Sequence, residues 1–300
     1  MSIASLYPFK VPLVAGTPAR PRFSLTSDIL SYRRCRKQYG AFGQDGFVPA
    51  RATQAFFGSA IHQVLDLCHR HYSQGSGTLP DDNDIDHYFT EVANALRSHG
   101  IRPASGSVSD KAREILKRFN TLEGPHLYPR VRDTEFRMES ERPNYVLRGV
   151  VDVLASDPND PQDPSKMEIW DYKGSRLPKA SDPRMKEYEW QMTVYAELFK
   201  RKNGAYPKRA ILYFLNELDI NPAPAQRPLR AVHIVNFDQA SVDKALTEFD
   251  ETADEIIQCD AQNTWPMPQV APDKETCDIC DLRWNCATKN GPYKLRMPIV

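Results

Sequence analysis

The segment between residues 145 and 174 places acids inside two apolar stretches, and this pattern limits the fold more than any other feature of the chain. It reads YVLRGVVDVLAS, then DPNDPQDPSK, then MEIWDYKG. The apolar stretches predict adjacent strands joined by a polar, proline-rich loop, with Asp152 in the first strand and Asp171 and Lys173 in the second. An acid inside an apolar strand costs free energy unless a counter-charge compensates for it, and a divalent cation is the usual one.

Because side chains alternate across a strand, Asp171 and Lys173 are expected on one face, with Trp170 and Tyr172 on the other. Two carboxylates from neighbouring strands, followed by a lysine, suit metal-assisted hydrolysis of a phosphodiester. The cation would polarise the phosphoryl oxygen and lower the pKa of a bound water, while the ammonium would offset negative charge. The structural alternative is that Asp152 serves a turn or salt bridge, and that the D-x-K tripeptide is a solvated ion pair.

Composition narrows the classes of protein that this chain can be. At 300 residues and 41% hydrophobic, the chain can bury a sizeable core. A formal net charge of zero argues against a strongly basic nucleic-acid coat, although it permits a locally basic groove. No apolar run approaches the roughly 18 residues of a membrane span, and the N-terminus lacks a signal-peptide core, so a cytoplasmic protein without membrane contact is expected.

The order of elements predicts an α/β fold with a mixed central sheet flanked by helices. A proline-punctuated arm over residues 1–23 precedes a single domain over 24–300. A helical insertion at about 80–128 is expected over the sheet, as a lid or channel wall. The expected helices cover about 24–39, 56–72, 84–98, 108–121, 184–202 and 238–259, and the expected strands cover about 131–139, 144–155, 169–173, 209–216 and 230–237.

Two helices carry further polar residues at suggestive positions. His62 lies beside the apolar stripe of the helix over 56–72. It is either a structural histidine or a metal ligand, since neutral imidazole binds divalent metals well. Gln191 and Tyr195 are four residues apart and therefore share a face of the helix over 184–202.

Three cysteines cluster near the C-terminus with the spacing C-x2-C-x5-C. Cys277, Cys280 and Cys286 need a fourth thiolate to bind tetrahedral zinc or a cubane iron–sulfur cluster, and the spacing does not decide between the two. Cys35 is the natural fourth ligand, because it is expected on a basic helix whose charges would lower its pKa. Such a site would staple a C-terminal segment at about 265–290 to the start of the chain. Buried free thiols are the alternative.

Together these motifs resemble the RecB-like branch of the PD-(D/E)XK nuclease superfamily. More narrowly, they resemble the members with a four-cysteine iron–sulfur staple, which are AddB-type nuclease domains and the exonucleases of CRISPR adaptation. The resemblance covers about residues 24–287 and implies a restriction-endonuclease-like core. It implies a Mg²⁺ or Mn²⁺ site formed by His62, Asp152, Asp171 and the backbone carbonyl of Tyr172. Beside this site it implies a catalytic Lys173, together with Gln191 and Tyr195, which would support the site and contact DNA. It also implies a [4Fe–4S] cluster, or zinc as the second choice, held by Cys35, Cys277, Cys280 and Cys286.

The activity implied by this resemblance is a metal-dependent deoxyribonuclease, acting as an exonuclease on single-stranded DNA or frayed ends. Its setting would be DNA repair and recombination or CRISPR adaptation, with a helicase or an integrase as the partner protein. The alternative is a catalytically idle iron–sulfur subunit that binds nucleic acid within such a complex. A third hypothesis is a zinc-stapled RNA-processing nuclease. Idle members of such folds tend to lose the acid or the lysine, whereas Asp152, Asp171 and Lys173 are all present here.

Overall fold

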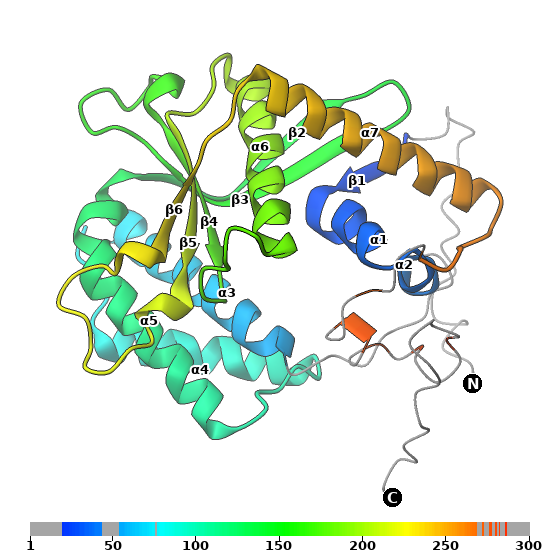
Figure 1. Cartoon of the computed structure of the whole chain (residues 1–300). Helices are drawn as coiled ribbons and strands as arrows, with labels where there is room; N and C mark the ends of the chain where they lie inside the picture. Colours follow the sequence, from blue (N-terminus) through cyan, green and yellow to red (C-terminus); the bar gives the residue numbers. More distant parts are fainter. Residues whose placement is uncertain are drawn as a thin grey trace, which may run out of the picture.

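A mixed sheet between two helical layers forms the framework of the protein (Figure 1). The computed structural model describes residues 20–43, 54–75 and 77–268, and residues 272, 276, 277, 280, 282 and 286. The strands are β1 (Arg22–Ser24), β2 (Val131–Glu141), β3 (Val146–Ala155), β4 (Glu168–Lys173), β5 (Arg209–Phe214) and β6 (Val232–Val235). The α-helices are α1 (Ser31–Arg34), α2 (Arg36–Gly43), α3 (Gln54–Gln74), α4 (Asp82–Ser98), α5 (Gly106–Leu127), α6 (Pro183–Asn203) and α7 (Gln239–Ala261).

Along the sheet the strands follow the order β1-β3-β4-β5-β6, and β2 also pairs with β3, outside this order. The pairs β1–β3 and β4–β5 are parallel, while β2–β3, β3–β4 and β5–β6 are antiparallel. The mixed sheet flanked by helices that the sequence predicts is therefore confirmed.

One edge of β3 is shared by two strands that do not meet. At its start β3 pairs with β1, and at its end it pairs with β4, where the last pairs run from Val153–Trp170 to Ala155–Glu168. Because β2 occupies the whole opposite edge, residues 149–152 have no strand partner on this edge. The backbone of Val150 instead bonds the side chain of Tyr195. The sheet thus opens a gap beside Asp152.

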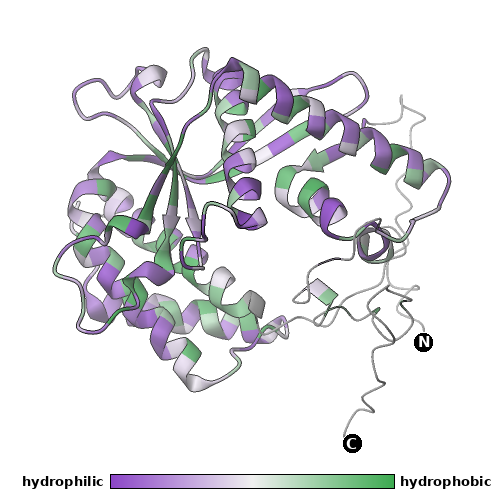
Figure 2. Cartoon of the chain, in the orientation of Figure 1, coloured by the Kyte–Doolittle hydropathy of each residue, from purple (hydrophilic) through white to green (hydrophobic). Residues whose placement is uncertain are grey.

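Two apolar cores lie on the two faces of the sheet. One core packs α6, α7 and the π-helix over Leu25–Leu30 against residues such as Ile169. The other packs α3, α4 and α5 against Trp170 and Tyr172. Figure 2 shows hydrophobic residues concentrated on the strands and hydrophilic residues on the outward sides of the helices. The predicted alternation along β4 is therefore confirmed, and Asp171 lies on the α6 side.

The region expected to be one continuous helix over 24–39 is broken. It forms the π-helix over Leu25–Leu30, then α1, then α2, and Cys35 lies between α1 and α2 in an extended conformation with φ −159°. Arg33 bonds Thr252 and Arg36 bonds Glu255, so the segments on either side of Cys35 both dock on α7. The prediction that Cys35 lies within a helix is wrong.

Other differences concern the ends of elements. The strand expected over 209–216 ends at Phe214, after which Leu215–Leu218 forms a 3-10 turn, and the strand expected over 230–237 covers only β6. The expected arm over 1–23 overlaps β1 at its end, and residues 1–19 lie outside the described residues. Short 3-10 turns also cover Tyr128–Arg130, Pro164–Lys166 and Leu229–Ala231.

The expected helical insertion consists of α4 and α5, which form the layer on one face of the sheet together with α3. Within the part of the chain that the structure describes, no helix is long and apolar enough to cross a membrane.

We expect Gly149→Ala to destabilise the protein, because Gly149 lets α6 approach the unpaired edge of β3. A β-carbon at this position would lie 2.7 Å from Leu198 Cδ1 and 2.8 Å from Tyr195 Cε1. Overpacking of this kind costs about 1–3 kcal/mol of unfolding free energy, measurable by urea denaturation. The matched control is Gly106→Ala at the start of α5, where a β-carbon meets open space. Equal stability of the two variants would contradict this account of the gap.

Candidate active site

A cleft of about 1230 Å³ opens at the gap in the sheet. Its walls come from β2, β3, the end of β4, α3, α6 and the segment around Ser24. The structure brings together every residue that the sequence singled out for the divalent-metal site. These residues line the cleft: His62, Asp152, Asp171, Tyr172, Lys173, Gln191 and Tyr195. No residue of α4 or α5, which the structure describes completely, lines the cleft, so these helices do not form the expected channel wall.

Asp152 links three elements through its carboxylate. Oδ1 lies 3.0 Å from Nδ1 of His62 on α3, and Oδ2 accepts a hydrogen bond from the backbone N–H of Tyr172 on β4. The last paired residues of β3 and β4 are Val153 and Trp170, so the Asp152 carboxylate accepts a bond from β4 just beyond the end of the ladder. Asp152 is therefore fixed in orientation at the point where the two strands separate.

The Asp152 carboxylate controls the charge of His62. Burial lowers the pKa of His62, but the charge and hydrogen bond of Asp152 outweigh burial and raise it to about 9. In the metal-free protein His62 is therefore an imidazolium paired with Asp152 at neutral pH. A cation that binds the Asp152 carboxylate would displace the imidazolium proton, after which the neutral ring could act as a ligand.

Asp171 is held among polar side chains beneath the cleft. It is 6% exposed, its Oδ1 accepts a hydrogen bond from Gln191 Nε2 at 3.1 Å, and Lys173 Nζ lies 2.7 Å from its Oδ2. Oδ2 is buried, and the ion pair with Lys173 is its one contact with a positive charge among the described residues. Burial raises the pKa of Asp171, Lys173 opposes that shift, and Asp152 adds to it. A second cation near Oδ2 would stabilise the ionised form.

Gln191 connects the acid, the lysine and the helix behind them. Its Oε1 accepts a hydrogen bond from Lys173 Nζ at 2.8 Å, and its Nε2 donates to Asp171 and to the hydroxyl of Tyr195. Tyr195 is only 2% exposed. It therefore supports the site from beneath, and a side chain so deeply buried offers no surface for the expected contact with DNA. The ring of Tyr188 adds a cation–π contact at 4.6 Å from Lys173 Nζ.

The second histidine on the same face of α3 has a different role. His69 is 2% exposed, and its Nε2 lies 3.0 Å from the hydroxyl of Tyr172. Burial lowers the pKa of His69 to about 4, so this ring is neutral. It positions the strand that carries Asp171 from the opposite face of the sheet.

Sequence reasoning missed the contribution of β2. Glu135, Arg137 and Glu139 line the cleft, while Phe136 and Met138 between them are buried. This alternation of polar and apolar residues was a readable signal, because it marks one face of a strand as solvated. Arg148 on β3 also lines the cleft and pairs with Glu139.

The fit of this site to a divalent metal rests on its donors. Among the residues that the structure describes, no three or more His, Cys, Asp or Glu side chains are arranged to hold a metal ion. In the cleft the reason is visible, since the donors pair with one another: His62 with Asp152, and Lys173 with Asp171. Carboxylate oxygens and one imidazole are suitable ligands for Mg²⁺ or Mn²⁺, and the buried Oδ2 of Asp171 is held only by its ion pair with Lys173. The donor set fits such an ion.

The cysteines occupy a separate region. Cys35, Cys277 and Cys280 are buried, and Cys286 is half-buried. Burial raises the pKa of Cys35, with further contributions from Cys280 and Cys277, so the prediction that basic neighbours lower this pKa is wrong. Burial likewise raises the pKa of Cys286, and the other three thiols add to the effect. The thiols thus influence one another electrostatically, but among the described residues they are not arranged as a group that could hold a metal ion.

Trp265 fixes the position of the segment that connects α7 to the C-terminal cysteines. Its ring contacts the rings of Tyr32 and Tyr39, with centroids 6.4 and 5.6 Å apart, and it fills the space above Gly40. The chain that leaves α7 is thereby held against α1 and α2 on either side of Cys35. The remaining residues between Cys277 and Cys286 lie largely outside the described residues.

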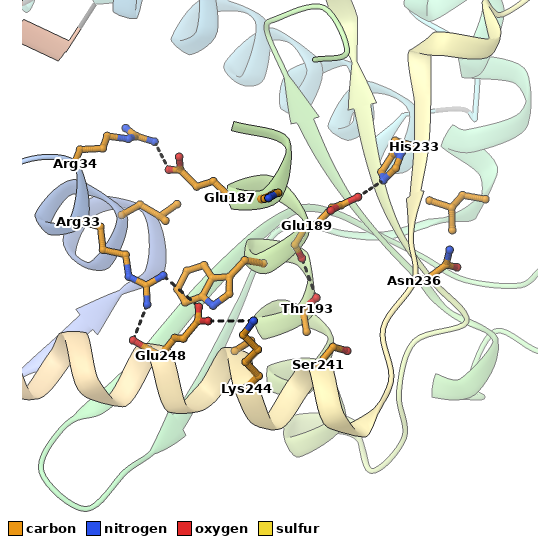
Figure 3. A pocket seen from close by; sticks show the side chains of 15 residues that line it. Arg33, Arg34, Glu187, Glu189, Thr193, His233, Asn236, Ser241, Lys244 and Glu248 are labelled. Atoms are coloured by element: carbon orange, nitrogen blue, oxygen red, sulfur yellow. Dashed lines mark hydrogen bonds and ion pairs between the residues drawn. The ribbon is translucent and has the colours of Figure 1, made fainter. Parts of the chain in front are cut away.

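A second cavity, of about 710 Å³, lies on the other side of α6 (Figure 3). Its charged residues are largely paired with one another: Arg34 contacts Glu187 at 2.8 Å, and His233 contacts Glu189 at 3.1 Å. A phosphate entering this cavity would have to displace carboxylates. The cleft, where two acids, a histidine and a lysine meet, is therefore the candidate active site.

We expect the stability that His62 contributes to the metal-free protein to be lost in alkali. Its folded pKa of about 9 lies above the unfolded value of about 6.5, so the contribution is complete below pH 6.5 and disappears as the pH rises through 9. The measured quantity is the difference in unfolding free energy between the parent and His62→Gln, with chelator present. This difference should be larger at pH 6 than at pH 9.5, by about 1–2 kcal/mol. This range is discounted for partial exposure. His87→Gln, altered on the exposed face of α4, is the control, and a pH-independent difference for His62→Gln would contradict the assignment.

Comparison with known proteins agrees with this geometry. A model of the PD-(D/E)XK nuclease superfamily matches residues 24–287. A search of the curated proteins finds no match. Among solved structures, one described as "Putative exonuclease" from Eubacterium rectale is 14% identical, with 92% of this chain and 90% of that chain covered and a TM-score of 0.49. Another, SSO0001, is 15% identical, with 79% and 96% covered and a TM-score of 0.33. These two similarities are too weak to carry an argument, whereas the family match spans most of the chain: the protein belongs to the PD-(D/E)XK nuclease superfamily.

Proposed function

We propose that the protein is a metal-dependent deoxyribonuclease that hydrolyses phosphodiester bonds in the cleft, as an exonuclease on single-stranded DNA or frayed ends. The observation that carries the proposal is the convergence of His62, Asp152, Asp171 and Lys173 from α3, β3 and β4 on one cleft. Membership of a nuclease superfamily agrees with this chemistry.

Each residue has a distinct role in the proposed reaction. His62, Asp152, Asp171 and the backbone carbonyl of Tyr172 would hold Mg²⁺ or Mn²⁺. When bound, this ion supplies Lewis-acid polarisation of the phosphate and lowers the pKa of a water ligand. Lys173 holds the attacking water and offsets the negative charge that develops on the phosphate. Gln191 accepts a hydrogen bond from the ammonium of Lys173 at 2.8 Å and donates one to the Asp171 carboxylate at 3.1 Å, so it fixes the position of the lysine relative to the acid.

Cations at the rim support a nucleic-acid substrate. Arg137 lines the cleft beside the acids without an ion-pair partner among the described residues, so its guanidinium can bind a phosphate that flanks the scissile bond. Arg34 and Arg148 also line the cleft, but each would first have to release its carboxylate partner, Glu187 or Glu139. The preference for single strands and for ends follows the resemblance of the motifs to the RecB-like branch.

We further propose that Cys35, Cys277, Cys280 and Cys286 hold a [4Fe–4S] cluster with a structural role, and zinc is the alternative occupant. Support comes from the burial of Cys35, Cys277 and Cys280 and from the packing of Trp265 against α2, which holds the chain beyond α7 next to Cys35. Four cysteine thiolates suit either occupant. Bound there, the group would connect the start and the end of the nuclease domain.

The resemblance of the motifs also supports a setting in DNA repair and recombination or in CRISPR adaptation. A helicase would be the partner protein in the first setting and an integrase in the second.

We expect Asp171→Asn and Lys173→Gln each to lower the rate of cleavage of labelled single-stranded DNA with Mn²⁺ by at least about 100-fold, because each removes a group that acts on the reacting phosphate. Circular dichroism would verify folding, since each change leaves a buried partner uncompensated. Lys179→Ala, a substitution on the exposed loop after β4, is the matched control. Parental rates for either variant would exclude this active site, and DNA binding without cleavage by the parent would favour the idle subunit.

Cys35→Ser should abolish the broad absorbance near 400 nm that a [4Fe–4S] protein shows when it is purified without oxygen. Cys68→Ser is the control, because Cys68 packs in the core between the sheet and α3–α5. A colourless parent that contains one zinc per chain would assign the site to zinc. A parent that contains neither iron nor zinc would contradict the proposed metal site.

A further inference from the structure

Glu135 on β2 lies opposite Asp152, and two features of its position cost free energy. The register pairs Thr134 with Val153 and Phe136 with Val151, which places Glu135 across from Asp152. Like charges directly opposite each other in an antiparallel pair are destabilising. Glu135 also has φ of 50°, in the left-handed region that residues other than glycine rarely adopt.

Among the described residues, only the nearby charges of His62 and Arg137 offset these costs, and neither side chain pairs with Glu135. Glu135 lines the cleft with its side chain exposed, so it contributes no core packing. Among the described residues, its carboxylate has neither an ion-pair partner nor a hydrogen-bond donor, although Glu139 on the same face pairs with Arg148 and Arg22. Strained and electrostatically unfavourable positions persist where function requires them.

We propose that Glu135 is a further ligand of the divalent cation, on the β2 side of the cleft. This inference rests on the proposed function, because it assumes a cation at Asp152. A cation shared by Glu135 and Asp152 would convert their repulsion into attraction to a common positive charge, and Mg²⁺ and Mn²⁺ prefer such carboxylate oxygens. Asp152 and Glu135 would then hold the ion from two neighbouring strands.

The test measures Mn²⁺ binding by titration calorimetry and melting temperature with and without Mn²⁺. We expect Glu135→Gln to weaken Mn²⁺ binding at least about 10-fold, because even the loss of a residue that only orients a metal ligand costs about 10- to 100-fold in metal affinity. Without metal, the variant should melt at or above the parental temperature, because one repulsive charge is gone. Its melting temperature should then rise less than that of the parent on addition of Mn²⁺.

Two further variants separate the possible outcomes. Glu139→Gln removes an equal charge from the same face of β2 and should bind Mn²⁺ within about twofold of the parent. Asp171→Asn tests the proposed function itself. If Asp171→Asn abolishes Mn²⁺ binding while Glu135→Gln binds as tightly as the parent, only the inference about Glu135 fails. Equal losses of Mn²⁺ affinity in Glu135→Gln and Glu139→Gln would show that the effect arises from the net charge of the cleft, and would also overturn the inference. If the parent binds no Mn²⁺, both the inference and the proposed function fail.

Discussion

The bond between the Asp152 carboxylate and the backbone N–H of Tyr172 is the contact around which the site is organised. It forms where the β3–β4 ladder ends, so one side chain both continues the connection between the strands and remains in the cleft. An apolar residue at position 152 would leave the Tyr172 amide unpaired and His62 without its partner. Strand pairing and the candidate chemistry therefore depend on the same carboxylate.

The gap in the sheet explains why the acids can meet a substrate. Had β4 continued to pair along β3, the backbone around Val150 would be closed off by a neighbouring strand. Instead β1 takes the first part of that edge, and α6 comes close over Gly149, where Tyr195 bonds the free backbone. Helix α6 then brings Gln191 to Asp171 and Lys173. A local interruption of strand pairing thus creates the cleft and positions its floor.

Much of this arrangement could be predicted from local sequence patterns. Alternation placed Asp171 and Lys173 on one face of β4, and helical spacing placed Gln191 and Tyr195 together. Residue spacing does not reveal burial or backbone breaks imposed by distant partners. The extended conformation of Cys35 depends on the docking of α1 and α2 on α7, and the burial of Tyr195 depends on the close approach of α6 to Gly149.

Glu135 shows the same limit in the cleft itself. Polar residues at alternate positions of β2 indicate a solvated face, but only the register reveals that Glu135 lies opposite Asp152. The register follows from pairing over the whole length of β2 and β3, which no short motif encodes.

The central claim is that one divalent cation binds between the acids of β3 and β4 and the imidazole of α3. Anomalous diffraction from crystals soaked in Mn²⁺ tests it most directly. The account predicts a manganese peak within coordination distance of Asp152, Asp171 and His62, with the His62–Asp152 ion pair broken. Full manganese occupancy elsewhere, with that ion pair intact, would contradict it.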